Sequence, residues 1–157
     1  MKKLFVFIIA ILLLGCSDGP KATFNDEFEI ADSRIVIPFE TIAGIYKLDN
    51  DSKIRYSLPL DVNLTLDIKP NKTFVANNYV NAKTWKLTNK ELKSFFYYLS
   101  DGNTLSISCP TLNDNSIINL YHRMSDNRIA LYVYTPPLKG EESGDYLRYI
   151  KVKDSIK

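Results

Sequence analysis

Hydrophobic and polar positions alternate along most of the chain from about residue 44 onward. The clearest example is the segment 62–68, in which every second residue from Val62 to Ile68 is apolar. An alternation with a period of two places the apolar side chains on one face of a β-strand. The same kind of pattern predicts further strands at residues 44–48, 54–60, 73–75, 79–87, 95–99, 104–108, 117–124, 129–134 and 146–152.

Turn signals separate these runs at intervals of roughly ten residues. Pro70-Asn71, Asp101-Gly102 and Ser125-Asp126-Asn127 each lie between two predicted strands, as the turns of β-hairpins do. Only residues 89–94 suggest a helix, which is too short to serve as a βαβ crossover. The pattern predicts an all-β fold with at most one short helix. We expect an antiparallel meander β-barrel, with a two-sheet β-sandwich as the alternative.

The N-terminal segment follows a different pattern. Lys2 and Lys3 precede residues 4–14, which contain no charged or polar side chain. A helix of this length rises about 16 Å, roughly half the hydrocarbon thickness of a bilayer. The segment is therefore typical of a signal peptide rather than of a membrane span.

The apolar run ends in Leu13-Leu14-Gly15-Cys16, which resembles the lipobox of bacterial lipoproteins. The resemblance implies that the chain is cut before Cys16, that Cys16 is diacylated on sulfur, and that the new amino terminus is acylated. Several acyl chains anchor a protein stably, whereas a single chain does so only marginally. The alternative is an ordinary secretory signal in which Cys16 is incidental.

The residue after the cysteine bears on the location. In lipoproteins sorted in the enteric manner, an aspartate there favours the inner membrane, and this chain has Ser17 instead. The resemblance thus implies the periplasmic side of the outer membrane. The outer leaflet of the inner membrane and the cell surface are the alternatives.

These features divide the chain into three parts: a signal peptide (1–15), a lipidated cysteine with a flexible tether rich in charged and small residues (16–32), and a single β-rich domain (33–157). The formal net charge of +2 belongs to the signal peptide. Without Lys2 and Lys3, 18 basic residues remain against 18 acidic ones, so bulk charge gives no reason to expect a nucleic-acid partner.

A second resemblance concerns the β-rich domain. Its first predicted strand carries Gly44-Ile45-Tyr46, followed by a meander of short hairpins. This is similar to the small lipocalin-like (calycin) barrels found in many bacterial lipoproteins, whose first strand often carries Gly-x-Trp; Tyr46 stands in place of the tryptophan. The resemblance implies a barrel that can hold an apolar ligand.

Candidate catalytic residues are few. Cys109, the only thiol once Cys16 is lipidated, is expected to be a small buried residue, and His122, the only histidine, is expected to pack among apolar neighbours. Glu141, Glu142 and Asp145 are expected to be solvated charges in a glycine-flanked loop. The chain has no phosphate-binding glycine-rich loop and no Gly-x-Ser-x-Gly elbow. We therefore expect no enzymatic activity, no cofactor and no metal site.

Tyrosine is abundant, with ten residues in the chain. Tyrosines that face outward from a sheet supply contact area and a polar tip, as recognition surfaces do, although tyrosine also simply favours strands. Together with the loop that follows strand 129–134, they form our candidate binding surface: Tyr132, Tyr134, Tyr146, Tyr149, Pro136, Pro137, Leu138 and Lys139.

The sequence thus predicts a lipid-anchored periplasmic binding module that engages a protein or a small apolar ligand. An inhibitor or immunity lipoprotein that docks a loop in the cleft of a hydrolase is one form of this hypothesis. A structural lipoprotein that maintains the cell envelope is the alternative, and a hydrolase that uses Cys109 is a third.

Overall fold

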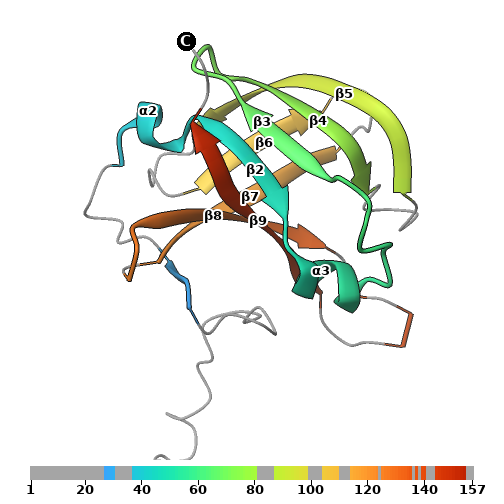
Figure 1. The fold of residues 1–157 in the computed structure, drawn as a ribbon. Coiled ribbons are helices and arrows are strands. Elements are labelled where there is room, and N and C mark those ends of the chain that lie inside the picture. The colour runs from blue at the N-terminus through green and yellow to red at the C-terminus, as the bar shows by residue number, and fades with distance from the viewer. Residues whose placement is uncertain are drawn as a thin grey trace, which may run out of the picture.

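The computed structural model describes residues 27–30, 37–80, 87–98, 104–109, 114–123, 125–135, 137, 139–140 and 144–154. These residues form nine strands and two short helices (Figure 1). In chain order the elements are β1 (Glu29–Ile30), α2 (Phe39–Ile42), β2 (Gly44–Leu48), α3 (Asn50–Arg55), β3 (Thr65–Ile68), β4 (Thr73–Val80), β5 (Leu87–Tyr98), β6 (Thr104–Cys109), β7 (Asp114–Arg123), β8 (Arg128–Thr135) and β9 (Asp145–Asp154).

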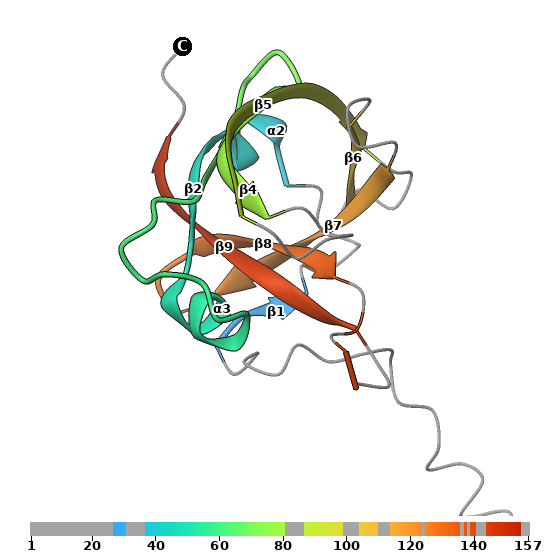
Figure 2. The ribbon, with the colours of Figure 1, turned by 90° about the vertical axis from the view of Figure 1, so that its right-hand side faces the viewer.

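Every strand pairing is antiparallel, and the strand order is β1-β7-β6-β5-β4-β3-β2-β9-β8, with β7 also paired to β8. The strands curve around the interior, with β4 and β5 on one side and β8 and β9 on the other (Figure 2). The prediction of an antiparallel all-β fold is confirmed.

One cluster of buried side chains fills the interior, and each strand from β2 to β9 contributes to it. The alternation seen in the sequence accounts for this: Leu64, Leu66 and Ile68 are buried, whereas the residues between them are less buried. The buried members of the cluster are Ile42, Tyr46, Leu48, Leu64, Leu66, Ile68, Phe74, Ala76, Leu92, Leu105, Ile118, Leu120, Ile129, Leu131, Leu147 and Tyr149.

The region between β2 and β3 differs from the prediction. Residues 54–60, expected to be a strand, contain the end of α3 and a turn. Asp49 begins this helix, because its side chain accepts a hydrogen bond of 2.8 Å from the backbone N–H of Ser52. Asp51 in the first turn and the basic Lys53 and Arg55 in the last turn further suit the helix dipole.

The helix expected at residues 89–94 is also wrong, because these residues lie within β5. Leu92 pairs with Ala76 of β4 and is buried in the core. Pairing with a neighbouring strand here outweighs local helix propensity. The prediction of at most one short helix is wrong as well, because the described residues form two, α2 and α3, and neither lies at residues 89–94. No helix among the described residues is long and apolar enough to cross a membrane.

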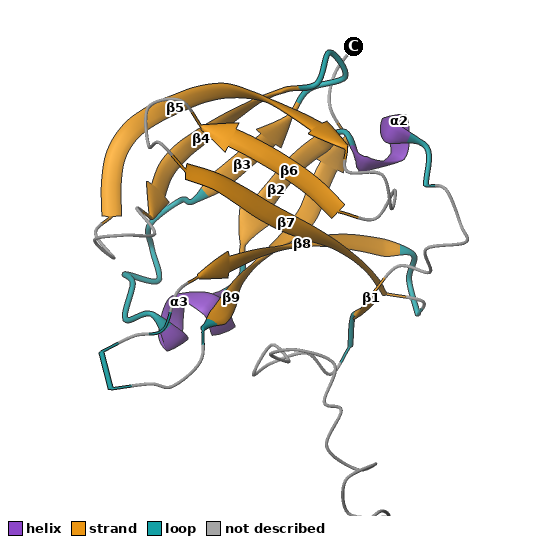
Figure 3. Cartoon of the chain, turned by 180° about the vertical axis from the view of Figure 1, so that it is seen from behind, coloured by secondary structure: helices purple, strands orange, loops and turns teal. Residues whose placement is uncertain are grey.

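The folded part of the chain begins earlier than the sequence indicated. Residues 27–30, assigned to the flexible tether, lie against β7 (Figure 3). Glu29 pairs with His122 and Ile30 pairs with Tyr121, while Phe28 is only 2% exposed. An aromatic side chain within a run of charged and small residues therefore supplies the packing that holds this segment.

Candidate functional site

The loop that joins β8 to β9 is the candidate docking loop, and its two stem residues are buried. Thr135 at the end of β8 pairs with Asp145 at the start of β9. Pro137, Lys139 and Gly140 in the loop are exposed. Pro136, Leu138, Glu141 and Glu142 lie outside the described residues. The loop thus combines an exposed tip with a base that is part of the folded domain.

Polar side chains from α3 and the turn after it hold this base. The Thr135 hydroxyl donates to the backbone carbonyl of Asp145 at 2.8 Å. The same hydroxyl lies 2.7 Å from the Tyr56 hydroxyl, which is then the donor of that bond. Because all of these groups are at least partly buried, an unpaired partner would cost the free energy of desolvation.

Asp145 corrects the expectation of a solvated acidic cluster, because its carboxylate is buried and paired. One oxygen accepts the Arg55 Nε–H at 3.2 Å, and the other accepts the backbone N–H of Tyr146 at 2.8 Å. Asp145 therefore belongs to the loop base rather than to the exposed tip.

Gly144 allows the two stems of the loop to lie close together at its base. A Cβ atom at this position would lie 2.2 Å from the Thr135 carbonyl oxygen and 2.4 Å from the Tyr134 hydroxyl. Both distances are too short for real contacts, so the two stems can approach each other only because residue 144 has no side chain.

Four tyrosines form a continuous cluster on the outer face of β7, β8 and β9, the face opposite the core. The rings of Tyr121 and Tyr132 stack with centroids 3.9 Å apart, and Tyr132 meets the edge of Tyr146 at 6.0 Å. Tyr146 in turn meets Tyr134 at 5.6 Å, which brings the cluster to the loop base. Such edge and offset contacts are the favourable arrangements of aromatic rings.

This geometry corrects the expected tyrosine surface. Tyr132 and Tyr146 are buried in the cluster, and Tyr149 is buried on the opposite face, in the core. Only Tyr134, 43% exposed, remains as a contact residue. The outer face is covered because Phe28 packs on it, although the sequence placed this residue in the tether.

Phe28 lies close to two guanidinium groups. The Cζ atom of Arg123 is 5.1 Å from the ring centroid of Phe28, and that of Arg148 is 5.6 Å away. The ring also meets the edge of Tyr132 at 6.5 Å. Cation–π contacts of this kind stabilise an aromatic ring beside buried cations.

Arg148 of β9 joins this aromatic cluster to α3. Its guanidinium forms ion pairs with Asp49 and, at 2.9 Å, with Asp51. Its backbone N–H donates to the Ser52 hydroxyl at 2.9 Å. The guanidinium also hydrogen-bonds Tyr132. The Arg148 side chain is only 7% exposed and that of Asp49 is 11% exposed, so their pair is shielded from solvent and salt, whereas Asp51 is 62% exposed.

Burial changes the acidity of the tyrosines. Desolvation raises the pKa of Tyr132 to about 12, although the hydrogen bond and the charge of Arg148 oppose this shift. Burial likewise raises the pKa of Tyr121, Tyr146 and Tyr149. All four phenols are therefore neutral at physiological pH.

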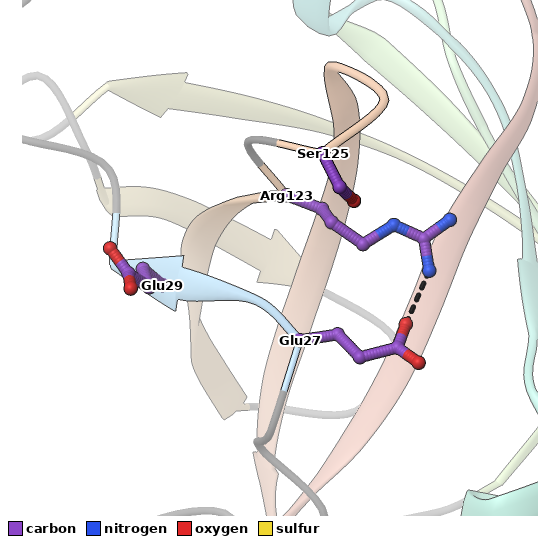
Figure 4. A pocket seen from close by; sticks show the side chains of 4 residues that line it. All are labelled: Glu27, Glu29, Arg123 and Ser125. Carbon is purple, nitrogen blue, oxygen red and sulfur yellow. Dashed lines mark hydrogen bonds and ion pairs between the residues drawn. The ribbon is translucent and has the colours of Figure 1, made fainter.

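A pocket of about 390 Å³ lies at the far end of the cluster, lined by Glu27, Glu29, Arg123 and Ser125 (Figure 4). Arg123 faces Glu27 and forms an ion pair with it. Its other guanidinium edge binds Asp126, with distances of 2.8 Å from Nε and 2.6 Å from Nη2. Through these two ion pairs, Arg123 links the N-terminal segment to the β7–β8 turn.

Two other residues singled out in the sequence stand apart from the loop. His122 is half-buried, and its Nε2 lies 2.6 Å from Asn127 Oδ1 in the β7–β8 turn. Cys109 is the last residue of β6, and its side chain lies outside the described part of the structure, as does Cys16.

The residues that hold the loop base were missed in the sequence. Arg55 and Tyr56 fell in a predicted strand, and Arg148 was treated as an ordinary strand residue. The signal that could have found the first two is Asp49 followed by Asp51 and Ser52, a typical helix start before basic residues. No local signal marks Arg148, because its partners are distant in sequence.

The residues described above interact with one another through apolar packing, hydrogen bonds and ion pairs. Among these residues, no three His, Cys, Asp or Glu side chains gather as metal ligands. No protein-family model matches the chain, and neither the curated proteins nor the solved structures contain a match.

The raised pKa of Tyr132 predicts an alkaline loss of stability. The folded protein keeps this proton up to a pH of about 12, whereas the unfolded chain loses it near pH 10, so the free energy of unfolding falls as the pH rises through this range. Tyr132→Phe should reduce the fall between pH 8 and pH 11 by on the order of 1 kcal/mol. Urea unfolding at the two pH values measures it, and an equal fall in both proteins would contradict the prediction.

Proposed function

We propose that this protein is a lipid-anchored binding module of the periplasm, without enzymatic activity, that engages a protein partner through the loop between β8 and β9. The observation that carries the proposal is the buried polar base of the loop. Thr135 and Asp145 are bonded to each other and to Tyr56 and Arg55, respectively. A loop with a fixed base loses less conformational entropy on binding than a free loop does, because its stems are already ordered.

The residues exposed around this base suit a protein partner. Tyr134 offers an aromatic surface, and Pro137 and Lys139 add a rigid apolar ring and a cation. Tyrosine is enriched at protein interfaces because it combines a large apolar area with a polar tip. An inhibitor or immunity lipoprotein that docks this loop into the cleft of a hydrolase is one form of the proposal.

The filled interior favours a ligand that binds outside the sheet rather than an apolar ligand that binds inside it. Each strand from β2 to β9 buries side chains in one shared cluster, including the large Tyr46, Phe74 and Tyr149. These side chains occupy the space where a lipocalin-like protein would hold its ligand.

We also propose that β2–β9 form a lipocalin-like meander barrel. The single shared core supports this arrangement. The strand pairings support it as well, because β2 pairs with β9 in addition to the pairings of consecutive strands from β2 to β9. A two-sheet sandwich has no need of a pairing between its first and last strands.

The proposed anchor is Cys16, in the lipobox-like sequence Leu13-Leu14-Gly15-Cys16. The chain from Cys16 to Glu27 spans at most about 40 Å when fully extended. The domain would thus lie close to the membrane, on the periplasmic side of the outer membrane.

Substitution of Cys16 tests the anchor. When the full chain is expressed with an alkyne-bearing fatty acid, the wild-type protein should incorporate the label and enter the detergent phase. Cys16→Ser should lose the label and stay in the longer, uncut form, because cleavage depends on the lipidated cysteine. Cys109→Ser is the matched control and should be labelled like the wild type. Equal labelling of Cys16→Ser and the wild type would disprove the anchor.

Site-specific crosslinking tests the docking loop. A photoreactive amino acid at Lys139 of the full chain should form an adduct with one envelope protein, and the same amino acid at the exposed Lys93 of β5 should not. Tyr134→Ala should reduce the yield of the Lys139 adduct several-fold, because it removes the aromatic contact beside the loop. The same adducts at both positions, or none at Lys139, would rule out this loop as the docking site.

A further inference from the structure

A second pocket, of about 320 Å³, lies at the opposite end of the β8–β9 hairpin from the docking loop. It is formed where the start of β8 and the end of β9 meet Thr41 of α2. The turn of residues 125–127 contributes to both pockets, with Ser125 lining the pocket beside Arg123 and Asn127 lining this one. We refer to it as the basic pocket, because Arg128, Lys151 and Lys153 line it together with a single carboxylate, Asp154.

Lys151 is a fixed part of this pocket. Its ammonium donates to the Thr41 carbonyl oxygen at 2.7 Å and pairs with Asp154 Oδ1 at 2.7 Å. Its side chain is only 13% exposed, whereas that of Asp154 is 89% exposed. The Lys151 ammonium is therefore fixed by the fold, whereas the Asp154 carboxylate that it binds belongs to a solvent-exposed side chain.

Gly44 makes this position of Lys151 possible. A Cβ atom at residue 44 would lie 2.4 Å from Lys151 Cε and 2.5 Å from the Lys153 carbonyl oxygen. Without a side chain at Gly44, the Lys151 stem lies across β2 and reaches Thr41. The strand pairing shifts here, so that Ile45 pairs with Lys153 and Tyr46 with Lys151, which leaves Val152 as an extra residue in β9. Bulges of this kind re-aim side chains and are frequent beside binding sites.

The other two cations are more open. Arg128 is 53% exposed and shares the carboxylate of Asp126 with Arg123, at an Nε–Oδ2 distance of 3.1 Å. Lys153 is exposed. Three cations and one carboxylate line the pocket, and Arg128 also contacts Asp126 outside the lining, so cations outnumber carboxylates even when Asp126 is counted. This positive excess favours an anion such as a phosphate monoester, which carries a charge of about −1.5 to −2 at neutral pH.

We propose that the basic pocket binds a phosphate group, with Lys151, Lys153 and Arg128 as its ligands. The phosphate takes the place of the Asp154 carboxylate on Lys151, and Asp154 turns out to solvent. Val152, which is 61% exposed, lies beside the cations and provides apolar contact for the organic part of a phosphate ester. The site is independent of the docking loop, and neither proposal requires the other.

Titration calorimetry of the full-length protein in detergent tests the site with three probes: inorganic phosphate, glycerol 3-phosphate and dihexanoyl phosphatidic acid. Lys153→Gln and Lys151→Met should each weaken phosphate binding about tenfold or more. Asp154→Asn should strengthen it several-fold, because the competing carboxylate is removed. Lys93→Gln, on the distant β5, should leave it unchanged.

The probes also distinguish the two sources of phosphate. Tighter binding of dihexanoyl phosphatidic acid than of glycerol 3-phosphate identifies a lipid headgroup as the ligand, and equal binding identifies a soluble phosphate ester. Absence of binding by all three probes would overturn the proposal. Equal weakening by Lys153→Gln and Lys93→Gln would overturn it too, since binding would then reflect net charge alone. Gly44→Ala, which displaces the Lys151 stem, should weaken binding even though no cation is removed.

Discussion

The buried guanidinium of Arg148 connects three parts of the molecule that are far apart in sequence. It pairs with Asp49 and Asp51 at the start of α3, hydrogen-bonds Tyr132 in the aromatic cluster, and lies over the ring of Phe28 in the N-terminal segment. Each contact offsets part of the free energy needed to bury the charge, which would be several kcal/mol for an unpaired ion. The position of α3, and with it Arg55 and Tyr56 at the loop base, follows from this arrangement.

The hairpin of β8 and β9 places two different surfaces at its two ends. At one end, the stems of the docking loop are fixed by buried hydrogen bonds, while Tyr134 and the described loop residues face solvent. At the other end, the fold holds Lys151 against Thr41 beside the more open Arg128 and Lys153. Both faces of this hairpin are covered, by the core on one side and by the tyrosine cluster on the other. A hairpin packed on both faces is a rigid support, which suits surfaces that bind a partner.

The sequence predicted those features that depend on local pattern. Alternation over residues 62–68 indicated a strand with one buried face, and the hairpin turns at Asn71 and Asn127 followed from local turn chemistry. Prediction from the sequence failed where contacts between residues far apart in the chain determine the structure. Residues 91–94 pair with β4 despite their helical pattern, and Phe28 contacts arginines 95 and 120 residues further along the chain. The docking loop was found from its glycines and prolines, whereas the burial of Tyr132 and Tyr146 depends on what covers the outer face, which alternation cannot reveal.

Hydrogen exchange in Arg148→Gln tests most directly whether this one side chain holds both the N-terminal segment and α3. The amides to follow are those of β1 and of Lys53 and Tyr56, which donate to the carbonyls of Asp49 and Ser52. The account predicts that both regions exchange faster than in the wild type, while the amides between β3 and β4 keep their protection and the exposed Arg128→Gln variant resembles the wild type. Unchanged exchange in either region of Arg148→Gln would contradict the account.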